Sequence, residues 1–172
     1  MRNIMLDLET LSTQPNATIV SIGAVRFDEK DIDGDGFYCI LDLQEQIDMG
    51  RHVSGGTLQW WMKQSPEARA VFEGANKPIK EALDEFADFV GDNALIWGNG
   101  SDFDNVALGS LYDALNIRRP WNYAAGRCFR TIKNLLQVKE LPGRKGTYHN
   151  ALHDALYQAQ CLQVYLKGKV KL

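Results

Sequence analysis

Long apolar runs are missing from this sequence of 172 residues. No stretch approaches the ~20 apolar residues that a membrane-spanning helix needs. The apolar residues near the start, Ile4 to Leu6, are too few for a signal peptide. We therefore expect a cytoplasmic protein with no membrane partner. The length suits one globular domain, residues 1–172, with a single sizeable core.

Cysteine is scarce as well. Cys39, Cys128 and Cys161 are odd in number and widely spaced. They form no CxxC pair and so do not match a zinc-ribbon pattern. We interpret them as idle thiols in a reducing compartment, because free cysteine behaves as a small hydrophobe.

An excess of positive charge is also absent, since the formal net charge is −3. The charges are nevertheless distributed unevenly. Residues 117–146 contain one acid, Glu140, and eight basic residues: Arg118, Arg119, Arg127, Arg130, Lys133, Lys139, Arg144 and Lys145. Such asymmetry is expected of a surface that binds a polyanion. A solvated basic surface explains the pattern equally well, so charge alone does not decide the function.

The order of apolar patterns predicts an α/β fold. Residues 4–8, 18–27 and 37–43 have strand character and are joined by short turns, which indicates an antiparallel meander. Helical periodicity then dominates, interrupted by one further buried strand at 94–97. The expected helical segments are 57–63, 66–72, 79–90, about 102–115, 128–138 and 150–166. This order favours a mixed sheet flanked by helices.

Three acids fall where they could meet at one site. Asp7 and Glu9 lie two residues apart on the first expected strand, so their side chains point to the same face. Burying two unpaired carboxylates is costly, and hard cations such as Mg²⁺ favour oxygen ligands. Asp104 follows the strand at 94–97 near the start of a helix, where backbone N–H groups favour a carboxylate. Taken singly, each acid has a simpler interpretation as an exposed or helix-capping residue.

A fourth acid and a histidine open the last expected helix. Asp154 lies near its start, and His149 lies in the loop before it, free to reach a water molecule. An imidazole can accept a proton near physiological pH. His149 and His153 also have the spacing of a zinc-binding HExxH pair, but Asn150 stands where that motif needs its glutamate.

Together these segments resemble the motifs of the DEDDh 3′–5′ exonucleases, the superfamily of proofreading domains, RNase T and oligoribonuclease. The residues that carry the resemblance are Asp7-Leu8-Glu9-Thr10, Asn99 through Phe103-Asp104, and His149-x-Ala151-x-x-Asp154-Ala155. The segment Thr57-Leu58-Gln59-Trp60-Trp61 is similar to the small, phage-type exonuclease VIII-like branch.

The resemblance implies an RNase H-like fold and hydrolysis of the 3′-terminal phosphodiester of DNA or RNA to nucleoside monophosphates. Two divalent cations, Mg²⁺ or Mn²⁺, would stabilise the attacking and leaving oxygens. The implied metal ligands are Asp7, Glu9, Asp104 and Asp154. His149 would deprotonate the attacking water. The implied partner is a nucleic acid with a free 3′ end, single-stranded or overhanging, and a homodimer is left open.

The expected substrate contacts have two sources. The resemblance implies that Thr10 and Leu11 pack against the terminal nucleotide, with Phe103 either an apolar wall or a core residue. Charge alone adds Arg127, Arg130 and Lys145 as candidate phosphate contacts. The competing hypothesis is a non-catalytic nucleic-acid-binding module with the same fold. Binding alone would need neither the histidine nor the clustered acids, which disfavours it.

Overall fold

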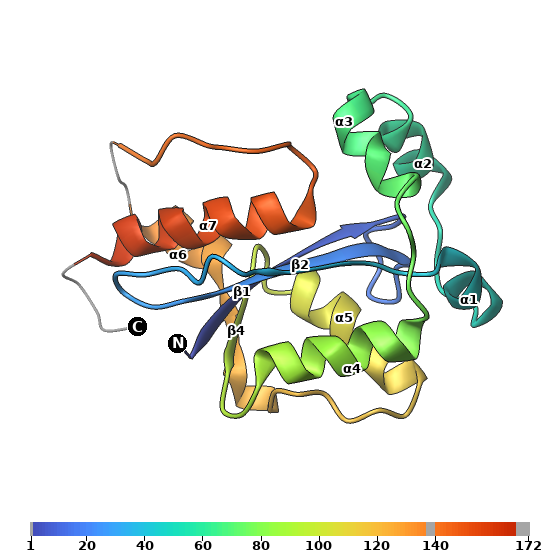
Figure 1. The fold of residues 1–172 in the computed structure, drawn as a ribbon, viewed down its shortest axis with the longest axis horizontal. Coiled ribbons are helices and arrows are strands. Elements are labelled where there is room, and N and C mark those ends of the chain that lie inside the picture. The colour runs from blue at the N-terminus through green and yellow to red at the C-terminus, as the bar shows by residue number, and fades with distance from the viewer. Residues whose placement is uncertain (1, 137–139, 168–172) are drawn as a thin grey trace.

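The computed structural model describes residues 2–136 and 140–167. Their centre is a mixed five-stranded sheet with helices on both faces (Figure 1). The strands have the spatial order β3-β2-β1-β4-β5. β1 pairs antiparallel with β2, and β2 with β3, whereas β4 runs parallel to β1 and β5 parallel to β4. The strands are β1 (Asn3–Thr10), β2 (Ile19–Phe27), β3 (Phe37–Ile40), β4 (Leu95–Gly98) and β5 (Gly126–Cys128).

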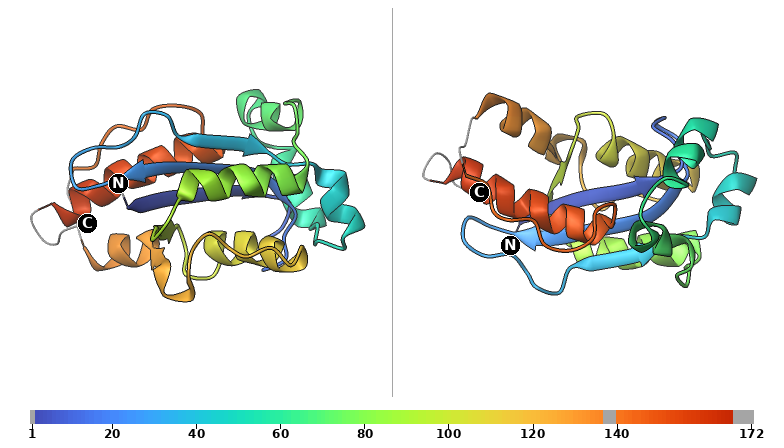
Figure 2. Two further views of the ribbon diagram at one scale, coloured as in Figure 1. Left: turned by 60° about the horizontal axis from the view of Figure 1, so that its bottom comes forward. Right: turned by 90° about the horizontal axis from the view of Figure 1, so that it is seen from above.

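The helices lie in two layers and one end group. α4 and α5 cover one face of the sheet, and α7 crosses β1 and β2 on the other (Figures 1 and 2). α2 and α3 stand together at one end. The helices are α1 (Leu43–Asp48), α2 (Gly55–Trp61), α3 (Pro66–Arg69), α4 (Ile79–Val90), α5 (Asp104–Ala114), α6 (Phe129–Leu135) and α7 (Ala151–Leu166). Of the described helices, none is both long and apolar enough to cross a membrane.

Strand β1 separates two apolar cores. Ile4, Leu6 and Leu8 pack in one cluster with residues of α4 and α5. Met5, on the opposite face, packs in a second cluster with residues of α6 and α7. Side chains alternate along a strand, so the odd-numbered positions after Met5 also face α7. The two acids of β1 occupy those positions.

Three predicted segments have different bounds in the structure. The strand expected at 37–43 ends at Ile40, because Asp42 accepts a hydrogen bond from the Glu45 N–H at 2.9 Å and caps α1. The Asp-x-x-Glu spacing is a helix-start signal that the strand interpretation overlooked. The helix expected from about 102 begins at Asp104. The helix expected at 128–138 spans Phe129–Leu135, and residues 137–139 of that prediction lie outside the described residues.

Glycine allows α7 to lie directly on the sheet. A Cβ atom added to Gly23 of β2 would lie 2.1 Å from the carbonyl carbon of Ala151 and the amide nitrogen of Leu152. These are backbone atoms of the first turn of α7. Gly23 also pairs with Asp7 in the β1–β2 register. The close approach therefore brings the start of α7 over the acidic segment of β1.

Candidate active site

Three carboxylates from β1 and α7 form a cluster. One oxygen each from Asp7, Glu9 and Asp154 lies within 4.8 Å of the other two. β1 presents the first two acids toward α7, and the first turn of that helix supplies the third. Glu9 is buried, 7% exposed, whereas Asp7 and Asp154 are partly buried, so the cluster keeps some contact with solvent. The three acids, two from the first strand and one from the last helix, thus meet at one site.

Asp104 is tied to the same strand from the side of β4. Its Oδ1 accepts a hydrogen bond from the Leu8 N–H at 3.2 Å, and its Oδ2 accepts one from the Asn99 N–H at 2.8 Å. β4 pairs with β1 at Asn3–Met5. β1 then continues beyond that pairing, and the Asp104 carboxylate takes the backbone donor of the residue between the two β1 acids. The four acids of the DEDDh pattern are therefore adjacent.

The acids carry more negative charge than their surroundings balance. Burial, together with the charges of Asp104, Glu9 and Asp154, raises the pKa of Asp7 well above its usual value. Burial and the neighbouring charges of Asp154 and Asp104 raise the pKa of Glu9 to about 8. Burial raises the pKa of Asp104 to about 6, although hydrogen bonds from Asn99 and Leu8 act in the opposite direction. A cation is what such a site requires.

The donor set fits hard divalent cations. All the candidate ligand atoms are carboxylate oxygens, which Mg²⁺ and Mn²⁺ prefer. Oδ2 of Asp154 is buried and has no hydrogen-bond partner within residues 2–136 and 140–167. An orphaned buried carboxylate oxygen is costly unless something positive approaches it. Asp7, Glu9 and Asp154 could hold one ion directly, and Asp104 lies beside them.

Gln158 is a site residue that the sequence analysis missed. It lies one helical turn after Asp154, is 5% exposed, and its Nε2 donates to Oδ1 of Asp7 at 2.7 Å. Residues i and i+4 share a helix face, so the spacing from Asp154 could have identified it. Because the amide is neutral, Gln158 fixes the orientation of the Asp7 carboxylate and leaves its charge available to a cation.

His149 is held in an unusual backbone conformation against two tryptophans. Its φ is +60°, a left-handed value that is uncommon for residues other than glycine. Its ring meets Trp60 edge-on at a centroid distance of 4.7 Å and Trp61 at 6.3 Å. The Thr147 N–H donates to Nδ1 of His153 at 3.0 Å, which anchors the preceding loop. Strain of this kind is frequent at functional sites.

A cavity of about 490 Å³ opens beside Glu9. Thr10 and Phe103, two of the residues predicted to contact substrate, line it, and Trp60 of α2 lines it too. Leu11 is placed differently from the prediction: it is 4% exposed and packs in an apolar cluster with Val20 and other buried residues. The remaining lining residues are Leu8, Glu9, Thr13, Ser54, Gly56 and Thr57.

Of the three predicted phosphate contacts, the structure places one, Arg130, beside the acids. Arg130 reaches the site, since its guanidinium carbon lies 3.7 Å from the Cβ position of Gly100, and its charge lowers the pKa of Asp104. Arg127 donates instead to the carbonyls of Ala124 and Gly126, both at 2.8 Å. Lys145 is exposed.

A different basic residue touches the carboxylates. Nη1 of Arg144 lies 2.9 Å from Oδ1 of Asp154. Arg144 belongs to the basic segment recognised in the sequence. The net charge of that segment gives no reason to prefer Arg144 over Lys145.

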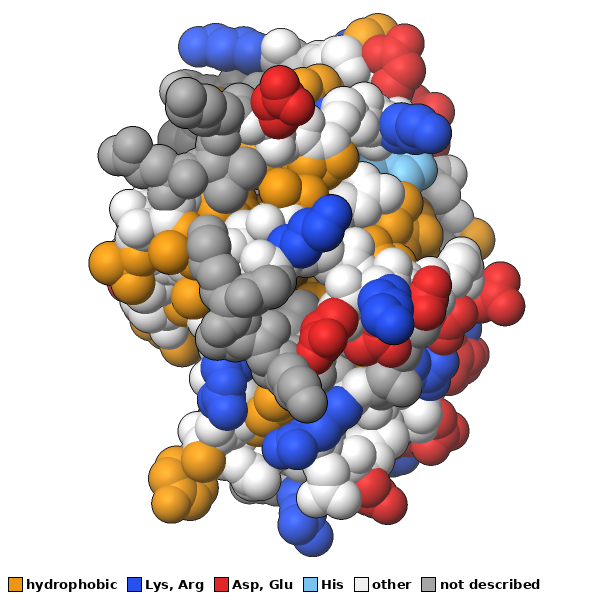
Figure 3. Space-filling model, turned by 90° about the vertical axis from the view of Figure 1, so that its left-hand side faces the viewer, with side chains coloured by type: hydrophobic (Ala, Val, Ile, Leu, Met, Phe, Trp, Pro, Cys, Tyr) orange, Lys and Arg blue, Asp and Glu red, His pale blue; other side chains and the backbone are white. Residues whose placement is uncertain are grey.

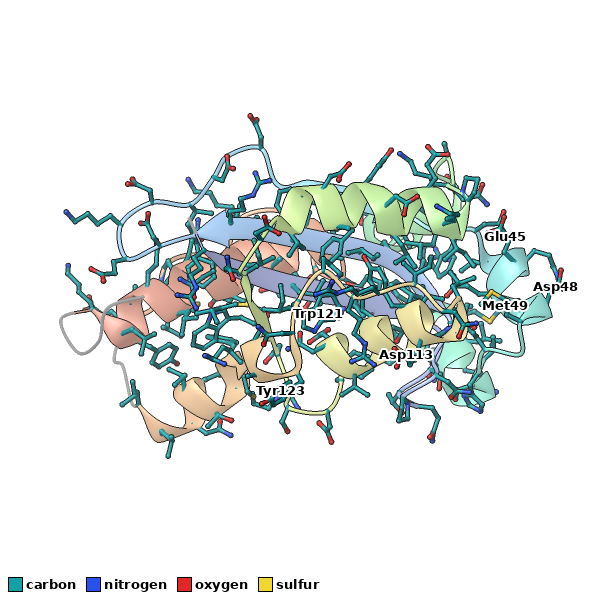
Figure 4. The ribbon with its side chains drawn as sticks, turned by 90° about the horizontal axis from the view of Figure 1, so that it is seen from below. Glu45, Asp48, Met49, Asp113, Trp121 and Tyr123 are labelled. Atoms are coloured by element: carbon teal, nitrogen blue, oxygen red, sulfur yellow. The ribbon has the colours of Figure 1, made fainter. Side chains whose placement is uncertain are left out.

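Other parts of the basic segment serve the fold. Arg119 forms an ion pair with Asp113 of α5. Trp121 packs edge-on against Phe86 of α4 and Tyr112 of α5 (Figure 4). At the end of the molecule away from α2, basic side chains lie interspersed with acidic ones (Figure 3). Arg119, one of the eight basic residues of 117–146, is thus paired within the fold.

Comparison with known proteins agrees with this geometry. Residues 2–166 match the family described as the 3′–5′ exoribonuclease Rv2179c-like domain. A relative named exodeoxyribonuclease, from Enterobacteria phage T4, is 23% identical over 193 residues, which cover 90% of this chain and 84% of the relative.

Two solved nucleases share the fold. The nuclease domain of 3′hExo, a DEDDh family member bound to rAMP, has a TM-score of 0.64 at 12% identity, covering 97% of this chain and 92% of its own. Cell-death related nuclease 4 (CRN-4) has a TM-score of 0.57 at 13% identity, covering 97% of this chain and 64% of its own. The predicted RNase H-like fold is confirmed. The narrower exonuclease VIII-like placement stays a prediction. With the family matched over almost the whole chain and the DEDDh acids in place, the chain belongs to the Rv2179c-like family of DEDDh 3′–5′ exonucleases.

Proposed function

We propose that this enzyme uses two divalent cations, Mg²⁺ or Mn²⁺, to remove nucleoside monophosphates one at a time from the 3′ end of RNA or DNA. Asp7, Glu9, Asp104 and Asp154 would hold the cations. The observation that carries the proposal is the cluster of three carboxylates, one buried and two partly buried, with oxygens within 4.8 Å of one another, beside a cavity large enough for a nucleotide.

The divalent cations, when bound, would neutralise the carboxylates and polarise the phosphodiester. The protein's own residues then have separate tasks. Gln158 orients Asp7 through the hydrogen bond at 2.7 Å. His149 accepts the proton of the attacking water, and Trp60 fixes the position of its ring. Arg130, beside the Asn99–Asp104 segment, supplies positive charge for a backbone phosphate.

The cavity beside Glu9 suits the terminal nucleotide. Trp60 and Phe103 offer aromatic surfaces, on which any base can stack. Thr13, Ser54 and Thr57 add hydroxyl groups that can bond to the sugar. Stacking is tolerant of base identity, so we expect degradation to proceed through mixed sequences. The family description names RNA and the phage relative's name indicates DNA, so both are candidate substrates.

The test is degradation of matched RNA and DNA oligonucleotides labelled at the 5′ end. With Mg²⁺ or Mn²⁺ we expect a ladder of labelled products that shorten from the 3′ end, and no products when a 3′-phosphate blocks that end. Ca²⁺ should support binding with little turnover, because its longer bonds and loose geometry suit in-line attack poorly. Brisk cleavage in excess EDTA would overturn the metal assignment. Binding without shortening in every metal would favour the non-catalytic module.

A further inference from the structure

Arg144 extends from the loop before α7 into the carboxylate cluster. Its Nη1 lies 2.9 Å from Oδ1 of Asp154, and the two side chains are only 12% and 19% exposed. Exposed ion pairs contribute little, but this pair is largely withdrawn from water. The contact also uses one oxygen of a residue that belongs to the candidate metal cluster.

Aromatic rings hold the guanidinium in place. Its central carbon lies 4.1 Å from the ring centroid of Tyr148 and 5.3 Å from that of Tyr157. Nη2 donates to the Thr147 carbonyl at 3.3 Å. Nε is buried, and the described part of the chain offers it no acceptor. A buried donor without an acceptor destabilises this arrangement. A different orientation of Arg144 that gives Nε an acceptor would remove that cost.

A divalent cation and Arg144 compete for the same acid. Asp154 has its Oδ1 against the guanidinium, while its Oδ2 has no partner among the described residues. A cation bound between Asp7, Glu9 and Asp154 would stand next to a fixed positive charge. Like charges at such separations repel, and more strongly where water is excluded. Metal binding therefore weakens the hold of Asp154 on Arg144.

We infer that Arg144 is the counter-cation of the metal-free site, and that metal binding releases it to contact a backbone phosphate of the substrate. The inference rests on the proposed function. A planar guanidinium presents paired N–H donors that match phosphate oxygens. Tyr148 and Tyr157 remain as a platform during the exchange, so the side chain needs only to turn its donors. Arg144 thus pairs with Asp154 in the metal-free protein and contacts substrate in the metal-bound protein.

The first test measures metal affinity without nucleic acid. Mn²⁺ is titrated by calorimetry into the wild type, Arg144→Gln and Arg144→Lys, at mildly alkaline pH so that protons compete little. We expect Arg144→Gln to bind Mn²⁺ about threefold or more tightly than the wild type, because the competing ion pair is gone. Arg144→Lys keeps the charge and should lie closer to the wild type. Arg118→Gln, at an exposed site lining a different cavity, removes the same charge and should change nothing.

The second test measures oligonucleotide binding in Ca²⁺. Both Arg144 variants should bind more weakly than the wild type, and in Arg144→Gln the slope of log affinity against log salt should fall by about 0.7 for one lost phosphate contact on a single strand. Thermal melts establish that each variant is folded, and Arg144→Lys carries the test if Arg144→Gln does not fold. Unchanged or weaker Mn²⁺ binding by Arg144→Gln, or unchanged oligonucleotide binding by Arg144→Lys, overturns the inference. Absence of Mn²⁺ binding by the wild type would instead contradict the proposed function.

Discussion

Asp7 is the residue on which the other acids converge. The charges of Glu9, Asp104 and Asp154 all raise its pKa, and its one hydrogen bond to a described side chain comes from the neutral amide of Gln158. A positively charged partner in place of the amide would have neutralised Asp7 without metal. The neutral amide leaves the charge of Asp7 uncompensated in the metal-free protein, and that charge favours a bound cation.

We predict that Asp7→Asn abolishes hydrolysis while the protein stays folded. The substitution removes a metal ligand and, in the metal-free protein, relieves repulsion among buried carboxylates. The melting temperature in EDTA should therefore rise. Activity assays and melts in EDTA measure both effects, with Asp102→Asn as a control, because that acid is exposed and two residues from Asp104. Full activity of Asp7→Asn at ordinary Mg²⁺ concentrations would exclude Asp7 as a ligand.

His149 gives a second prediction at this scale. His149→Ala should lower the single-turnover rate by ~10²–10⁴-fold, the usual contribution of a general base, and leave oligonucleotide affinity in Ca²⁺ nearly unchanged. His153→Ala is a poor control, because Nδ1 of His153 accepts the Thr147 N–H and anchors the loop. His153→Asn keeps an acceptor near that position and should retain most activity. If His153→Asn were the crippled variant and His149→Ala cleaved normally, the assigned base would be wrong.

Sequence reasoning located the acids more easily than their partners. Asp7 and Glu9 were recognisable because strand alternation fixes their relative direction, and Asp104 because it begins a helix. Arg144 lies in an irregular loop whose course depends on contacts with Tyr148 and Tyr157. No local pattern fixes where such a side chain ends. Sequence reasoning therefore named Lys145 and did not anticipate the contact of Arg144 with Asp154.

At the scale of elements, the close packing of α7 on β2 determines whether the site assembles. Gly23 supplies the space, and it pairs with Asp7 across the β1–β2 register. The first turn of α7 carries Asp154, and His149 precedes it. Any widening of the gap between helix and sheet therefore separates the acids of β1 from the acid of α7.

We predict that Gly23→Ala destabilises the protein by ~1–3 kcal/mol, the usual cost of overpacking, and weakens metal binding. The added methyl group would meet backbone atoms of Ala151 and Leu152, which cannot rotate away. Gly34→Ala is the matched control, because a Cβ there meets nothing within 4 Å. Denaturant unfolding and Mn²⁺ titration measure the two effects. Wild-type values for Gly23→Ala in both would show that the helix position is not critical.

The elements that the sequence analysis missed are short. β5 has three residues, Gly126–Cys128, and its strand conformation comes from pairing with β4. A segment of that length carries too little periodicity to be recognised. α1 could have been predicted, since Asp42 followed by Glu45 three residues later is a helix-start signal. The longer elements, such as α4 with its apolar stripe, agree closely with their predicted bounds.

At the scale of the whole molecule, the uncompensated acids link folding to pH and to metal. The folded state raises the pKa of Glu9 from 4.5 to about 8 and that of Asp104 to about 6. Between the unfolded and folded pKa values the folded protein binds more protons than the unfolded chain. Stability of the metal-free protein must therefore fall as pH rises through this window. A bound divalent cation replaces those protons and stabilises the folded state by mass action.

We predict that in EDTA the melting temperature falls as pH rises from about 6 to about 8, the upper part of the Glu9 window. The free energy of unfolding should fall by at most about 1.4 kcal/mol per pH unit for each proton. Saturating Mg²⁺ should abolish most of this slope and should stabilise the protein more at the higher pH. Glu9→Gln, which cannot ionise, should melt with a shallower pH dependence in EDTA. The control is Glu67→Gln, because that exposed acid has its pKa lowered by hydrogen bonds and does not titrate in this window. A melting temperature in EDTA that rises from pH 6 to 8, or an equal slope in Glu9→Gln and the wild type, would show that the buried carboxylates do not govern the stability of the metal-free fold.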